Sequence, residues 1–120
     1  MTTVLVVEDN EMNRDLFVRL LRTRDYEILE ADNGRDAIEV TRESRPDVVL
    51  MDLSMPVMNG WEAALALKEE SETADIPIIA VTAHATEGER EKALAHGCDE
   101  FISKPFDFDR LAELIESVVS

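Results

Sequence analysis

Short apolar runs alternate with longer amphipathic stretches along the whole chain. The apolar runs are rich in Val and Ile and are bounded by turn residues, which is typical of strands. They predict strands near 3–8, 26–31, 47–51, 77–82 and 99–102. The stretches between them repeat apolar residues at intervals of three and four, which predicts helices near 11–24, 34–44, 60–72, 86–96 and 107–119.

This regular alternation of strands and helices predicts an α/β fold. A five-stranded parallel sheet with right-handed crossovers would carry helices on both faces. Residues 4–7 and 48–51 are apolar at every position, as expected of central strands that are covered on both sides. We expect one domain over residues 1–120, because this length suffices for a single hydrophobic core.

Charged or hydroxyl side chains stand at the carboxyl ends of four of these apolar runs: Glu8, Asp9, Asp52, Thr82 and Lys104. The carboxyl ends of parallel strands meet at one edge of a sheet, and ligands bind there, where the strand order reverses. The sequence therefore predicts that these five side chains form one site.

The three acids of this set require a partner of opposite charge. Two carboxylates about 4 Å apart repel by roughly 4 kcal/mol at an effective dielectric constant near 20. Lys104 supplies one positive charge, and a divalent cation supplies two more. Because the candidate ligands are oxygens, with neither His nor Cys among them, Mg²⁺ is favoured. A metal, a cation and a central carboxylate suit phosphoryl transfer, with Asp52 as the nucleophile.

The net charge of −15 argues against nucleic acid and against anionic membranes as partners. The single cysteine, Cys98, excludes an internal disulfide and fits a reducing compartment. No apolar stretch approaches membrane-spanning length, and the first residues lack the features of a signal peptide. We therefore expect a cytoplasmic protein.

Four segments carry a family resemblance over the whole chain: 6–10 (VVEDN), 50–60 (LMDLSMPVMNG), 80–83 (AVTA) and 103–106 (SKPF). Each is moderately specific, and the four in this order and spacing are highly specific. The sequence resembles the receiver domain of two-component response regulators. The resemblance implies the flavodoxin-like receiver fold, with strand order 2-1-3-4-5.

The resemblance also implies the roles of individual residues. Asp52 would accept a phosphoryl group from a phosphohistidine of a sensor histidine kinase or a histidine phosphotransfer protein. Mg²⁺ would be held by Asp9 and Asp52, by Glu8 through water, and by the backbone carbonyl of Ser54. Thr82 would turn toward the phosphoryl group.

Three further implications concern the end of the chain. Lys104 would pair with the phosphoryl group, and the Lys104–Pro105 peptide bond would be cis. Phe101 would be the switch aromatic. The face formed by the fourth and fifth helices with the fifth strand would bind a downstream protein. We expect a monomeric signalling module that performs its own phosphoryl-acceptor chemistry and is not a turnover enzyme.

Some positions depart from the commonest pattern of the family. Glu8 stands where many relatives have Asp, and Phe101 stands where chemotaxis regulators have Tyr, so switching would depend on burial of the ring. Ser54 and His84 occupy positions that tune the lifetime of the phosphoryl group.

Three alternative functions stay open at this point. A flavin mononucleotide binder shares the predicted architecture, but it needs a phosphate loop where this chain has Glu8-Asp9-Asn10. A phosphatase with an Asp nucleophile commonly has a second acid two residues later, where this chain has Ser54. A receiver-shaped module that is never phosphorylated would not need the intact acids. The start at Met1-Thr2-Thr3 favours a single-domain regulator over a receiver cut from a hybrid kinase.

Overall fold

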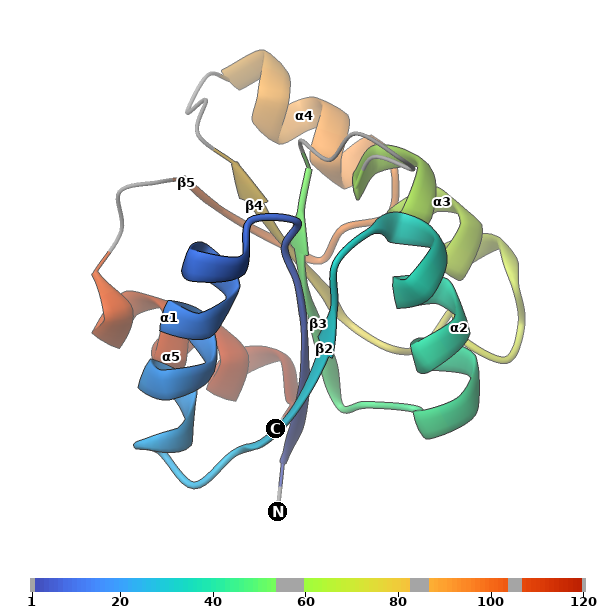
Figure 1. The fold of residues 1–120 in the computed structure, drawn as a ribbon. Helices are drawn as coiled ribbons and strands as arrows, with labels where there is room; N and C mark the ends of the chain where they lie inside the picture. Colours follow the sequence, from blue (N-terminus) through green and yellow to red (C-terminus); the bar gives the residue numbers. More distant parts are fainter. Residues whose placement is uncertain (1, 54–59, 83–86, 104–106, 120) are drawn as a thin grey trace.

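A computed structural model describes residues 2–53, 60–82, 87–103 and 107–119. In these residues, strands and helices alternate from end to end (Figure 1). The strands are β1 (Thr3–Val7), β2 (Glu27–Ala31), β3 (Val48–Asp52), β4 (Ile78–Thr82) and β5 (Glu100–Ser103). The helices are α1 (Glu11–Arg22), α2 (Gly34–Ser44), α3 (Gly60–Glu69), α4 (Glu87–Ala95) and α5 (Phe108–Val119).

The five strands form one parallel sheet in the order β2-β1-β3-β4-β5. This confirms the predicted fold and strand order. The order reverses between β1 and β3, which are neighbours in the sheet. Helices α1 and α5 cover one face, and α2 and α3 cover the other, with α4 beside β5 (Figure 1).

Side chains of the central strands point alternately to the two faces of the sheet, so each face has its own hydrophobic core. Val4 and Val6 of β1 face the α1 and α5 side, whereas Leu5 and Val7 face the α2 and α3 side. All of β3 is buried, so the all-apolar pattern of 48–51 reflects a strand covered on both faces.

Local signals set most helix ends. The Asn10 side chain accepts a hydrogen bond from the Asn13 N–H at 3.0 Å, which caps α1. Gly97, at φ 93°, follows α4, where a left-handed residue ends the helix. α3 ends at Glu69, three residues before the predicted end. There the Thr73 hydroxyl donates to the Leu67 carbonyl at 2.6 Å, so this side chain satisfies one of the carbonyl groups at the end of the helix.

Candidate functional site

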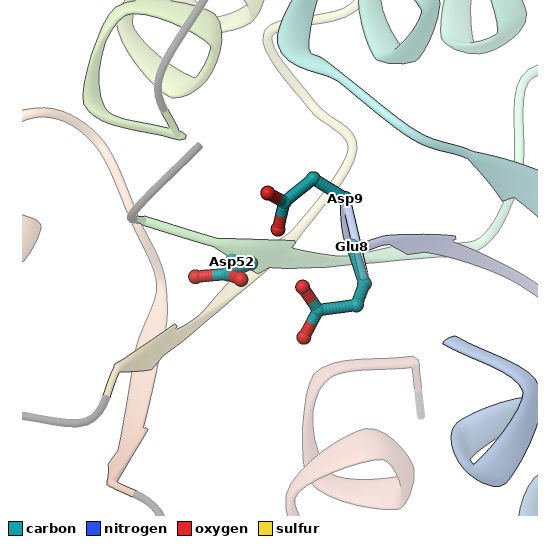
Figure 2. A group of neighbouring side chains, drawn as sticks. All are labelled: Glu8, Asp9 and Asp52. Atoms are coloured by element: carbon teal, nitrogen blue, oxygen red, sulfur yellow. The ribbon is translucent and has the colours of Figure 1, made fainter. Parts of the chain in front are cut away.

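The ends of two neighbouring strands bring three acids together at the carboxyl edge of the sheet. Glu8 and Asp9 follow β1, and Asp52 is the last residue of the neighbouring strand β3. Figure 2 shows the three side chains converging on one region beyond the strand ends. One carboxylate oxygen of each lies within 4.8 Å of the others. The predicted grouping of these acids is therefore present in the structure.

Burial differs among the three acids. Glu8 is 2% exposed and Asp52 is 7% exposed, whereas Asp9 lies at the surface. The pKa of Asp9 is raised above its usual value, mainly because its carboxylate is partly withdrawn from water. A hydrogen bond with Glu8 and the negative charge of Glu8 raise the pKa of Asp9 further. The cluster therefore carries unfavourable negative charge in the absence of a cation.

The donor set suits a hard divalent cation. All three ligand atoms are carboxylate oxygens, which Mg²⁺ prefers over nitrogen or sulfur. Two oxygens on one Mg²⁺ at about 2.1 Å are at most about 4.2 Å apart, so the present separations need little adjustment. Glu8, Asp9 and Asp52 therefore fit a magnesium ion.

The end of β4 lies beside the end of β3. In the sheet, Asp52 is opposite Val81, and Thr82 is opposite Ser103 of β5. Thr82 is buried and comes one residue after the partner of Asp52. The sheet thus places Thr82 at the same edge as the acids, as the sequence predicted.

Phe101 lies on β5, opposite Ala80, and is half-buried against the α2 and α3 core. The switch role of Phe101, which depends on burial of the ring, stays a prediction. Ser54, His84, Lys104 and Pro105 lie outside the described residues, so the predictions made for them stay predictions.

Sequence reasoning did not assign a role to Gly60, although the residue belongs to the motif after Asp52. A Cβ on Gly60 would lie 2.2 Å from the Asp52 carbonyl oxygen and 2.6 Å from the Leu53 Cα. Only glycine lets α3 begin this close to the end of β3. The motif Asn59-Gly60 marks a turn, but only the structure shows which backbone it approaches.

Arg14 also escaped sequence analysis. Its Nη1 donates to the Glu8 carbonyl oxygen at 2.8 Å, and its Nε donates to the Glu30 carboxylate at 3.3 Å. A lone arginine in the first turns of an amphipathic helix gives no sequence signal for such a contact.

Comparison with known proteins identifies the family. The response regulator receiver domain family matches residues 4–116. The chain belongs to this family. Receiver domains are signalling modules of two-component systems and bind Mg²⁺ at an acidic pocket, so the acidic cluster has the expected place in the fold. Family membership favours the receiver over the flavin-binding and phosphatase alternatives.

Individual relatives support this assignment. The polar-differentiation response regulator DivK of Brucella anthropi is 43% identical over 115 residues, which cover 96% of this chain and 94% of DivK. The receiver domain of sensor histidine kinase PA1611 from Pseudomonas aeruginosa has a magnesium ion coordinated in its active-site cleft. Its TM-score is 0.91 at 30% identity, with 98% of this chain and 97% of that chain covered.

A second similar structure is a complex. It contains the Saccharomyces cerevisiae histidine phosphotransfer protein Ypd1 and the receiver domain of the response regulator Ssk1. The match has a TM-score of 0.86 at 30% identity and covers 95% of this chain and 86% of that chain. Receiver domains thus interact with histidine kinases or phosphotransfer proteins. In the described part of this chain, no helix is long and apolar enough to span a bilayer.

Proposed function

We propose that this protein is a Mg²⁺-dependent phosphoryl acceptor in a two-component pathway, with Asp52 as the acceptor. The observation that carries the proposal is the convergence of Glu8, Asp9 and Asp52 within 4.8 Å at the switch point of the sheet. Residues 1–120 would act as one receiver domain.

The donor would be a phosphohistidine on a sensor histidine kinase or a histidine phosphotransfer protein. An Asp52 carboxylate oxygen would attack phosphorus while the phosphorus–nitrogen bond breaks. The imidazole nitrogen leaves with the electron pair of that bond and takes a proton from solvent. Mg²⁺, when bound, would neutralise negative charge on the transferring group. The product is an aspartyl phosphate and a neutral histidine.

Each remaining residue of the site would act on the phosphoryl oxygens or on the metal. Asp9 and Asp52 would hold Mg²⁺ directly, Glu8 would hold a water on it, and the Ser54 carbonyl would complete the protein ligands. The Thr82 hydroxyl would donate to one phosphoryl oxygen once the group is present. The Lys104 ammonium, outside the described residues, would pair with another phosphoryl oxygen.

The output would be a change in partner binding on the face formed by α4, β5 and α5. Phosphorylation would bias Thr82 and Phe101 between two arrangements, and a downstream protein would bind one of them better. The excess of acidic residues disfavours nucleic acid as the target.

Mass spectrometry after incubation with acetyl phosphate and Mg²⁺ tests the acceptor. We expect one added phosphoryl group, which requires Mg²⁺ and disappears in Asp52→Asn. Asp75→Asn is the matched control, because it removes an equivalent charge from an exposed position that pairs with Arg45. Phosphorylation that survives in Asp52→Asn, or that proceeds in chelator, would refute the proposal.

A further inference from the structure

Arg14 of α1 reaches back across the β1–α1 turn to the backbone that carries the metal-binding acids. Its guanidinium donates to the Glu8 carbonyl oxygen at 2.8 Å and to the Glu30 carboxylate of β2 at 3.3 Å. The Arg14 side chain is only 18% exposed, and its contact with the Glu8 carbonyl is partly buried, whereas its contact with Glu30 lies at the surface. Arg14 therefore connects α1, β2 and the end of β1.

The Glu8 backbone is consequently fixed from two sides. Its N–H donates to the Ala31 carbonyl at 3.1 Å, and its carbonyl accepts from Arg14. The Glu8 carboxylate in turn accepts from the Asn10 N–H at 3.3 Å. The peptide plane between Glu8 and Asp9 thus has its orientation set by Arg14, and this plane determines where the Asp9 side chain starts.

Two effects of Arg14 on a bound cation have opposite signs. As a nearby positive charge, the guanidinium would repel Mg²⁺ and weaken binding, although Glu30 offsets part of this charge. As an anchor of the Glu8 carbonyl, it would hold the acids in a binding geometry before the ion arrives. Contacts that orient metal ligands commonly change metal affinity by about 10–100-fold.

We propose that Arg14 is a positioning residue for the Mg²⁺ site, acting through the Glu8 carbonyl. The inference rests on the proposed function, in that it takes Glu8, Asp9 and Asp52 as the magnesium site. The anchor outweighs the repulsion, because the hydrogen bond to the Glu8 carbonyl is partly buried, while the charge of Arg14 is paired with Glu30.

Calorimetric titration of the purified protein with MgCl₂ tests the proposal without any phosphorylation. Arg14→Met removes the hydrogen bonds and one positive charge, and we expect the Mg²⁺ dissociation constant to rise about 10-fold. Arg19→Met is the matched control on the same helix. Arg19 pairs with Asp15 at the surface, so its loss should change the constant by less than about 1.5-fold.

Opposite outcomes separate the two effects. If Arg14→Met binds Mg²⁺ as tightly as the parent protein, or more tightly, the positioning role is overturned. Should Arg14→Met lose the near-ultraviolet circular dichroism of the folded protein, Arg14→Lys decides instead. Its charge is unchanged, so about 3-fold weaker binding supports positioning by the planar guanidinium, and unchanged binding overturns it.

Failure of this inference is distinguishable from failure of the proposed function. A parent protein that shows no Mg²⁺ binding refutes both. A parent protein that binds Mg²⁺, with Arg14→Met indistinguishable from Arg19→Met, refutes the role of Arg14 alone.

Discussion

Helices α4 and α5 flank β5 in the sequence and pack against opposite faces of the sheet, but they are held in very different ways. Four residues of α5 are buried against the sheet: Leu111, Ala112, Leu114 and Ile115. In the described side chains of α4, only Ala93 is buried. The large apolar residue Leu94 is 47% exposed.

Besides the buried Ala93, contacts at the surface hold α4 in place. The Lys92 ammonium lies 4.6 Å from the centre of the Trp61 ring, and the His96 ring lies 5.4 Å from the same ring. Such contacts contribute about 0.5–1 kcal/mol each at exposed sites, far less than a buried aliphatic side chain. The comparison indicates that α5 is a fixed part of the fold, whereas α4 can move at low cost. On the proposed output face, α4 is therefore the better candidate for the mobile element.

The largest expected difference comes from truncating one apolar side chain on each helix. Ile115→Ala leaves a cavity under α5 and should lower the free energy of unfolding by about 3 kcal/mol. Leu94→Ala removes exposed apolar area from α4 and should change the free energy of unfolding by less than about 0.5 kcal/mol. Urea unfolding followed by circular dichroism measures both. Equal losses would refute the contrast between the helices.

The junction after α4 should be more sensitive than its surface. Gly97 has φ 93°, and a Cβ there would lie 2.5 Å from the Lys68 Cγ. Lys68 cannot easily withdraw, because its ammonium donates to the Ala74 and Ile76 carbonyls and to Asp99. Gly97→Ala should therefore cost about 2 kcal/mol in the same urea assay.

Gly97→Asn separates the two causes of this loss. Asn tolerates positive φ better than Ala but also has a Cβ. A smaller loss for Asn identifies backbone strain as the main cause, and equal losses identify the Lys68 contact. If Gly97→Ala left the free energy of unfolding unchanged, the junction after α4 would tolerate substitution as well as the surface of α4 does.

Features that leave a pattern in the sequence were predicted, whereas contacts between side chains and distant parts of the backbone were not. Asp52 and Glu8 were predicted because each follows an apolar run, and strand ends meet at one edge in a parallel sheet. The early end of α3 was not predicted, because it depends on Thr73, which lies beyond the helix. The Arg14 contact was not predicted either, since side-chain contacts to backbone across elements leave no periodic pattern. The roles of Ser54, Lys104 and Pro105 rest on the family motif alone.

A smaller effect should follow from removing one charge at the acidic edge. Asp9→Asn removes the repulsion between Asp9 and Glu8. In the presence of chelator, the free energy of unfolding should therefore rise by about 1 kcal/mol or less, because Asp9 is exposed. The substitution should also weaken Mg²⁺ binding. The gain should appear in global unfolding, which α5 reports. Destabilisation of Asp9→Asn in chelator would refute the idea of a strained cluster.

The pH dependence of stability, compared between the parent protein and Asp9→Asn, tests the same repulsion. The pKa of Asp9 is raised in the folded state, so folding favours the protonated form. In chelator, this contribution to stability increases as the pH falls through the folded-state pKa toward 3.8, and it is lost as the pH rises again. Urea midpoints of Asp9→Asn minus those of the parent should therefore be larger at about pH 7 than at about pH 4. A difference independent of pH would contradict the assignment.

The smallest effect should come from removing one surface contact of α4. Lys92→Met removes the ammonium from the Trp61 ring, at a cost of about 0.5 kcal/mol. Because α4 is held mainly by this surface cluster, the cost should appear as local opening, with amide hydrogen exchange in α4 about 2-fold faster. In the parent protein, exchange in α5 should be much slower than in α4, because the core contacts of α5 open only with the whole fold. Lys92→Arg, which keeps a cation over the ring, is the control and should exchange like the parent protein. Exchange in α4 as slow as in α5 would show that the two helices open as one unit, and the proposed mobility of α4 would then have no basis.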